Sequence, residues 1–259
     1  MVRCCHSSGP LPLARHATAH PRRVRGSRCE FWIFGCNAEM TGQKEVQLFA
    51  VTNDGELNQY KKVQVLGAEA MPSGGDLTNE ADREAIRALE DQMIGAYGNA
   101  IVRKECAAPD EFGWVQLRGK MLRAEHLPAL SEAVAAHGVR VLILDNNQLG
   151  PEAGAGLAEV LRSGGSLEEL WLGGNALGDA GVEALAAALK EGAGAKLQVL
   201  LLDSNGITAK GAQALAGCLA ACGSLRQLWL GGLSNKLDDA AKQTLREAVA
   251  GREGLELML

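Results

Sequence analysis

The residues best suited to metal or redox chemistry lie near the start of the chain. Cys4, Cys5, His6, Cys29 and Cys36 offer the thiolate and imidazole ligands that zinc prefers. Their spacing lacks the tight ligand pairs of structural zinc sites, so the pattern does not favour a metal site. We accordingly predict that the protein needs no metal and no cofactor.

Other reactive side chains in the sequence have structural explanations. Cys218 and Cys222 are four residues apart in an apolar helical pattern, which favours buried thiols over a redox pair. His126 and His137 have no partner at a catalytic spacing. The sequence contains no phosphate-binding loop, no nucleophile elbow and no zinc-protease motif. These observations predict that the protein is not an enzyme.

Composition limits the class of molecule that positions these side chains. The chain has 259 residues, of which 47% are hydrophobic and 22% are charged, as in ordinary globular proteins. No run of about 18 apolar residues is present, which argues against a membrane-spanning helix. The net charge of -5 gives no indication of nucleic-acid binding. We therefore expect a globular protein that binds neither membranes nor nucleic acids.

Residues 1–39 form a basic segment that differs from the rest of the chain. Residues 1–40 contain six arginines and two glutamates. This composition fits a disordered tail, a mitochondrial or plastid presequence, or translated leader sequence ahead of a true start at Met40. Seven cysteines without the spacing of a disulfide framework favour a reducing compartment. We therefore expect a cytoplasmic protein, or an organellar one if residues 1–39 are a presequence.

Beyond residue 110 the sequence repeats itself. Segments that begin at Phe112, Val139, Leu167, Leu197 and Leu225 follow the pattern L-x-x-L-x-L-x-x-N-x-L, with small departures in the first and last. The pattern then continues as G-x-x-G-x-x-x-L-x-x-x-L, and equivalent leucines are 27 to 30 residues apart. Each segment therefore predicts a short strand followed by a helix.

This pattern resembles leucine-rich repeats of the ribonuclease-inhibitor type. The resemblance covers residues 112–259 and defines a repeat domain over residues 110–259 with about five repeats. It implies an α/β fold, a right-handed solenoid in which a parallel sheet lines the concave side and helices cover the convex side. The resemblance is specific for the fold and unspecific for the partner.

Individual residues support the same architecture. Outward strand positions alternate with inward leucines, as the two-residue period of a strand requires. Asp179 and Thr208 are predicted helix caps. Asparagines at the turn after each strand can satisfy backbone groups that the curved chain leaves unpaired. They are Asn147, Asn175, Asn205 and Asn235.

The outward strand positions form a candidate binding surface on the concave side. Exposed apolar patches mark interaction surfaces, and tryptophan is enriched among the residues that dominate binding energy. We expect Trp171 and Trp229 to be exposed anchors about 10 Å apart, with Leu201 between them. Alternatively, the N-terminal segment covers this apolar ridge of outward side chains, or the two tryptophan rings rest on each other. The candidate protein-binding residues are Trp114, Val141, Ile143, Asp145, Glu169, Trp171, Val199, Leu201, Asp203, Gln227 and Trp229.

Two segments flank the repeats. Residues 40–109 contain two strand patterns around residues 53–55 and a helical pattern from Leu77 to about Tyr97. We expect this hairpin-plus-helix segment either to cap the first repeat or to be mobile. Residues 255–259 have a strand pattern, and an exposed edge there could pair with another chain.

The sequence favours a non-enzymatic protein–protein interaction module that binds a protein partner on its concave sheet. Two alternatives stay open. One is a regulatory leucine-rich-repeat protein that acts on a small GTPase or another enzyme, although the activators of small GTPases that the repeats resemble have more than five repeats. The other is a fragment of a larger receptor or scaffold.

Overall fold

The computed structural model describes residues 46–51, 57–63 and 83–259. The chain divides into two compact units, Met1–Ala70 and Met71–Leu259. In the first unit, β1 (Val46–Val51) pairs antiparallel with β2 (Leu57–Val63). The basic segment 1–39, with its candidate zinc ligands, and the expected turn at residues 53–55 lie outside the described residues.

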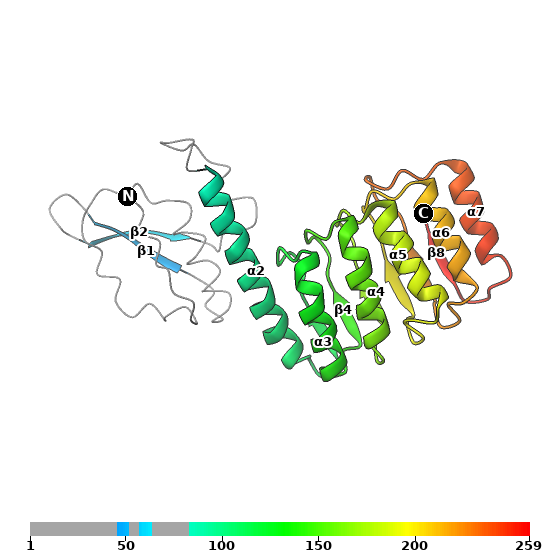
Figure 1. The fold of residues 1–259 in the computed structure, drawn as a ribbon, viewed down its shortest axis with the longest axis horizontal. Helices are drawn as coiled ribbons and strands as arrows, with labels where there is room; N and C mark the ends of the chain where they lie inside the picture. Colours follow the sequence, from blue (N-terminus) through cyan, green and yellow to red (C-terminus); the bar gives the residue numbers. More distant parts are fainter. Residues whose placement is uncertain (1–45, 52–56, 64–82) are drawn as a thin grey trace. The chain divides into compact units, whose positions relative to one another are not determined.

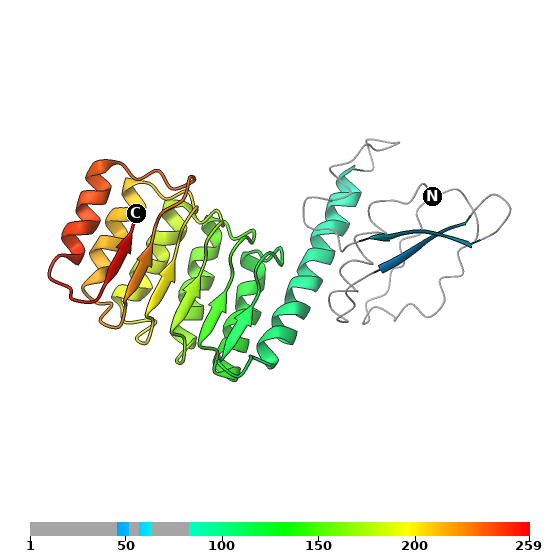
Figure 2. The same ribbon diagram turned by 180° about the vertical axis from the view of Figure 1, so that it is seen from behind.

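The second unit is a row of alternating strands and helices. Its six strands form one parallel sheet in chain order, and helices lie along one side of that sheet (Figure 1). Figure 2 shows the sheet from its other side. The strands are β3 (Trp114–Gln116), β4 (Val141–Ile143), β5 (Glu169–Trp171), β6 (Val199–Leu201), β7 (Gln227–Trp229) and β8 (Glu256–Met258).

Six α-helices alternate with the six parallel strands within the described residues, and this arrangement confirms the predicted α/β solenoid. None of the described helices combines the length and apolar character needed to span a membrane. Short 3-10 turns, η4 (Ala124–His126) and η5 (Pro151–Ala153), precede two of the helices. The helices are α2 (Arg83–Ala107), α3 (Leu127–His137), α4 (Gly154–Ser163), α5 (Gly178–Lys190), α6 (Ala209–Leu219) and α7 (Asp239–Val249).

The core lies between the sheet and the helices. The middle residue of each strand from β3 to β7 and the leucine after each of these strands point into it, because strand side chains alternate between faces. All ten of these side chains are at most 1% exposed. They are Val115, Leu142, Leu170, Leu200, Leu228, Leu117, Leu144, Leu172, Leu202 and Leu230.

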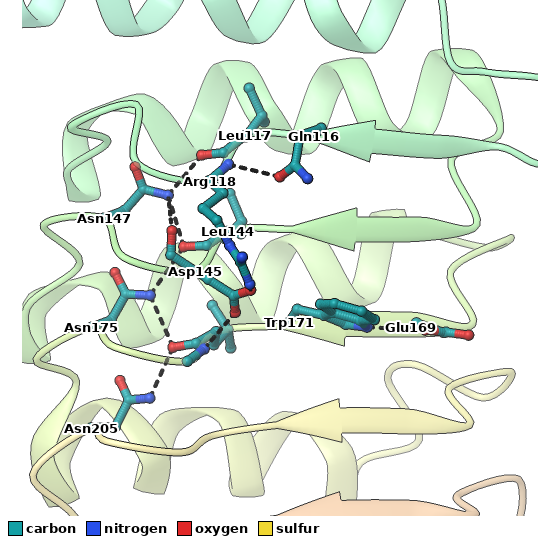
Figure 3. Close-up of polar contacts among 12 residues, drawn as sticks. Gln116, Leu117, Arg118, Leu144, Asp145, Asn147, Glu169, Trp171, Asn175 and Asn205 are labelled. Atoms are coloured by element: carbon teal, nitrogen blue, oxygen red, sulfur yellow. Dashed lines mark hydrogen bonds and ion pairs between the residues drawn. The ribbon is translucent and has the colours of Figure 1, made fainter. Parts of the chain in front are cut away.

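The asparagines satisfy backbone groups at the turns after the strands, as predicted, and they also bond neighbouring repeats to one another. The Asn147 amide donates to the carbonyls of Leu117 and Leu144, at 2.8 and 2.7 Å, and its oxygen accepts from Leu122 N at 3.0 Å. Asn175 repeats the arrangement one strand along, and Asn205 donates in the same way to a carbonyl of the preceding repeat (Figure 3). These side chains satisfy backbone groups that no strand partner reaches.

The two predicted helix caps have different roles. The Thr208 hydroxyl accepts from Lys210 N and caps α6. Asp179 does not cap its own helix α5, which contradicts the expectation from the sequence. Its carboxylate instead accepts from Thr208 N at 2.8 Å, Thr208 Oγ1 at 2.6 Å and Gly211 N at 3.0 Å. Burial acts to raise the pKa of Asp179, but these hydrogen bonds outweigh it and leave the pKa lowered.

Helix α2 packs beside α3 at the start of the solenoid. It extends ten residues past the expected end at Tyr97 and stops just before Ala108, which precedes Pro109 and is therefore disfavoured in helical geometry. Within this helix, the residues that face the repeats are buried. They are Ile94, Tyr97, Ile101, Val102 and Cys106.

Candidate protein-binding surface

The sheet face opposite the helices carries two rows of side chains. The parallel register aligns the first residue of each strand with the first residue of the next, and the third with the third. The strand-start row is Trp114, Val141, Glu169, Val199, Gln227 and Glu256. The strand-end row is Gln116, Ile143, Trp171, Leu201, Trp229 and Met258.

The apolar residues of these rows differ in exposure. Trp114 is 45% exposed and Trp229 is 38% exposed. Trp171, Val199 and Leu201 are half-buried. The expectation of a solvated ridge along the whole sheet is wrong at β4, where Val141 and Ile143 are buried.

Two aromatic rings account for the burial at β4. Trp114 is level with Val141, and Trp171 is level with Ile143, so the two tryptophans lie diagonally across β4. Their ring centroids are 6.5 Å apart and the ring planes are tilted by 55°. The rings therefore lean together over β4 and remove its outward side chains from water. The alternative drawn from the sequence had the rings of Trp171 and Trp229 resting on each other; the ring that contacts Trp171 is instead Trp114.

A hydrogen bond also fixes the Trp171 ring. Its Nε1 donates to Glu169 Oε2 at 2.9 Å, so the two outward residues of β5 bond each other (Figure 3). No such aromatic contact or side-chain hydrogen bond holds Trp229 among the described residues. The two tryptophans that look equivalent in the sequence therefore lie in different environments.

The candidate binding residues Asp145 and Asp203 lie against other parts of the protein. Asp145 is buried; its Oδ2 accepts from Arg118 Nη2 at 2.6 Å and its Oδ1 accepts from Gly173 N at 2.8 Å (Figure 3). Asp203 is half-buried beside Gly173, and a Cβ on that glycine would lie 2.6 Å from the Asp203 carboxylate. These two acidic residues, each the second residue after a strand, therefore lie against the sheet and are not displayed to solvent.

Sequence reasoning missed an open pocket at the start of β3, β4 and β5. The Asp110 carboxylate accepts from Phe112 N at 3.0 Å and Trp114 N at 2.8 Å, which shapes the loop before β3. Arg140 Nε and Nη2 donate to the two oxygens of Glu168 at 2.9 and 2.8 Å, and this pairing lowers the pKa of the Glu168 carboxyl. The pocket encloses about 550 Å³ and is lined by Asp110, Phe112, Trp114, Arg140, Glu168 and Glu169, with Val141 among them.

Sequence reasoning also missed Met258 as a surface residue. It occupies the strand-end row beside Trp229 and is 41% exposed. The signal was present, because residues 255–259 carry the strand pattern of the earlier repeats without the rest of the motif. β8 is the last strand of the sheet, and its hydrogen bonds run to β7, from Leu230 N to Met258 O at 2.8 Å.

Comparison with known proteins gives matches to the repeats. A family model described as leucine-rich repeat matches residues 166–186 and 195–216. The ribonuclease inhibitor of Sus scrofa is 38% identical over 117 residues, which are 45% of this chain and 25% of that protein. The chain therefore spans about a quarter of the length of this relative. A solved structure of leiomodin-1 actin-binding site 2 has a TM-score of 0.45 and 16% identity, covering 58% of this chain and 86% of that one.

The six-stranded parallel sheet, its helices and the asparagine bonds between repeats define a leucine-rich-repeat solenoid. Each repeat is 27 to 30 residues long and pairs a short strand with a helix, which places these repeats among the long leucine-rich repeats. The chain contains leucine-rich repeats of the ribonuclease-inhibitor-like type.

Proposed function

We propose that this chain is a non-enzymatic protein-binding module that receives a protein partner on its concave sheet. One observation carries the proposal. Trp229 and Met258 lie next to each other on β7 and β8, at 38% and 41% exposure, and half-buried Leu201 extends the same row on β6. Large apolar side chains placed together in water are typical of interaction surfaces.

Two further observations support this function. The ribonuclease inhibitor of Sus scrofa, by its name, acts on a ribonuclease, which is a protein. The sequence contains no phosphate-binding loop, no nucleophile elbow and no zinc-protease motif, so the proposal assigns no catalytic residue. The proposed role of the sheet is therefore recognition.

Affinity capture with the full chain tests the proposal. Wild-type protein, Trp229→Ala and Met258→Ala serve as baits, and captured proteins are identified and then purified for direct titration. Leu233→Ala is the matched control, because Leu233 is fully exposed but lies in the loop after β7 and outside the two rows.

We expect a partner that wild type and Leu233→Ala retain, and that binds Trp229→Ala at least about thirtyfold more weakly, since an anchor residue contributes about 2 kcal/mol or more. A partner that binds all four proteins equally would place the binding surface elsewhere. Because the titration uses purified components, it excludes proteins that were captured only through a third protein.

We also propose that the protein resides in the cytoplasm. Cys106, Cys218 and Cys222 are free thiols in the structure, and free thiols are typical of reducing compartments. Microscopy of the full chain with a C-terminal fluorescent tag tests this. Signal confined to mitochondria or plastids would instead identify residues 1–39 as a presequence.

A further inference from the structure

The pocket at the start of β3, β4 and β5 combines solvent-exposed aromatic rings with carboxylates. Phe112 is 60% exposed and Trp114 is 45% exposed. Trp171 supports the Trp114 ring from one side, at 6.5 Å between centroids, so the ring is held in place while part of it faces solvent. We call the pocket the corner pocket; it is lined by Asp110, Phe112, Trp114, Arg140, Val141, Glu168 and Glu169.

Charge in the corner pocket is predominantly negative. Its charged lining residues are Asp110, Glu168, Glu169 and Arg140. Arg140 is the cation among them, and both of its bonded nitrogens are engaged by Glu168. Among the described residues, Asp110 and Glu169 therefore form no ion pair, although the positive charge of Arg140 lies close enough to act on Glu169.

Each of these two carboxylates is oriented through one oxygen. Asp110 Oδ1 accepts two backbone N–H groups, and Glu169 Oε2 accepts the indole N–H of Trp171. In the described part of the chain, no hydrogen bond engages Asp110 Oδ2 or Glu169 Oε1. The bonds fix the carboxylates and leave their second oxygens able to accept from a ligand.

We propose that the corner pocket binds an arginine or lysine side chain from an extended, basic segment of the protein partner. A cation placed over the Trp114 ring gains attraction from the face of the ring, and the neighbouring carboxylates of Asp110 and Glu169 accept its N–H groups. Arginine fits best, because its planar group can stack on a ring and bond a carboxylate at the same time. The inference rests on the proposed function and specifies the chemistry of the partner.

Binding of defined peptides to the full chain tests this inference. The probes are fluorescently labelled acetyl-(Gly-Arg)4-amide, the matching Gly-Lys peptide and the matching Gly-Glu peptide, followed by anisotropy at low ionic strength. Glu169→Gln removes one charge and keeps an oxygen that can accept from Trp171. Glu132→Gln is the matched control, because Glu132 is exposed on α3 on the helical side of the sheet.

We expect the Gly-Arg peptide to bind most tightly, the Gly-Lys peptide more weakly and the Gly-Glu peptide not at all. Glu169→Gln and Trp114→Ala should each raise the dissociation constant of the Gly-Arg peptide about tenfold, the scale of one cation–π contact or charged hydrogen bond. Glu132→Gln should leave it within about twofold. Thermal melts of Trp114→Ala verify that the variant folds, and Glu169→Gln tests the pocket independently of that ring.

Equal weakening by Glu132→Gln and Glu169→Gln would overturn the inference, because attraction would then follow the net charge of the chain rather than the pocket. Binding of the Gly-Glu peptide as tight as that of the Gly-Arg peptide would overturn it too. Trp229→Ala should not change peptide binding, since β7 is four strands from β3. Loss of partner capture in Trp229→Ala without peptide binding would therefore reject the pocket alone and keep the proposed function.

Discussion

The side-chain amide of Asn175 satisfies three backbone groups. Its Nδ2 donates to the carbonyls of Leu144 and Leu172, at 3.1 and 2.9 Å, and its Oδ1 accepts from Leu149 N at 3.3 Å. Asn175→Ala should lower the free energy of unfolding by about 1–3 kcal/mol, because buried backbone groups would lose their partners. Urea denaturation followed by circular dichroism measures the change.

Gln148→Ala is the control for that substitution, since Gln148 is exposed and its side chain makes a solvent-exposed hydrogen bond, from Arg123 Nε at 3.0 Å, in place of buried ones. Its free energy of unfolding should stay within about 0.5 kcal/mol of the wild-type value. An unchanged denaturation midpoint for Asn175→Ala would contradict the structural role of the asparagines.

Trp171 and Trp229 should respond differently to truncation. The Trp171 ring is half-buried, contacts Trp114 and bonds Glu169, so Trp171→Ala should cost about 1–3 kcal/mol of stability. Trp229→Ala should cost about 0.5 kcal/mol, as is usual for a surface residue. Leu200→Ala, which truncates a side chain with 1% exposure, should cost about 2–5 kcal/mol. Equal losses for both tryptophans in urea titrations would show that the ring contact contributes nothing.

At the scale of whole elements, sequence periodicity was sufficient to predict the strands and helices of the repeats but not which side chains of the sheet are exposed. The alternation of inward leucines predicts β4 to β7 because each strand position is tied to a repeated motif. The burial of Val141 and Ile143 depends instead on the rotamers of two tryptophans from neighbouring strands, which no pattern along the chain encodes. The corner pocket depends on Asp110, which precedes the first repeat, and on Phe112, which is exposed although the first residue of each later repeat is buried.

The ion pair between Arg118 and Asp145 could have been predicted. Each residue is the second after its strand in adjacent repeats, and adjacent strands lie about 4.8 Å apart. Opposite charges at matching positions of neighbouring repeats are therefore close enough to bond. The same comparison pairs Asp145 with Gly173, whose N–H reaches the Asp145 carboxylate.

The contact between α2 and η4 contains a buried histidine. The His126 side chain is fully buried, and a Cβ on Gly98 of α2 would collide with its ring, so glycine at that position makes room for the imidazole. Its Nδ1 accepts from Arg123 N at 2.8 Å, and Glu125 Oε1 lies 3.6 Å from Nε2. Burial lowers the pKa of His126 below its ordinary value of 6.5, although the Glu125 carboxylate acts to raise it.

The free energy of unfolding should therefore decrease as the pH is lowered below about 6.5. The unfolded chain binds a proton at His126 that the folded chain resists, so the stabilisation is complete above the unfolded pKa and decreases as pH falls toward the folded pKa. Urea midpoints measured between pH 7.5 and 5.5 should show this loss. In His126→Asn, whose amide oxygen can still accept from Arg123 N, the loss over this interval should be smaller. An equally steep loss in that variant would assign the pH dependence to other groups.

At the scale of the whole molecule, each repeat contacts mainly its neighbours. Asn147, Asn175 and Asn205 each donate to a carbonyl of the preceding repeat, and the bonds from Thr208 and Gly211 to Asp179 also join adjacent repeats. A solenoid of this kind needs its terminal apolar surface covered. Helix α2 covers that surface at α3, and it belongs to the same compact unit as the repeats, Met71–Leu259.

Fragments of the chain test whether α2 is needed. Fragments that start at Met40 and at Met71 should melt within a few degrees of the full chain, because the unit Met71–Leu259 has its own core. A fragment of residues 110–259 should melt about 10 °C lower or aggregate. It would expose the face of α3 that α2 buries, and each large apolar side chain returned to water costs about 1.5–3 kcal/mol. Calorimetry of the four proteins decides the matter: equal melting temperatures for fragments 71–259 and 110–259 would show that the repeats are stable without α2.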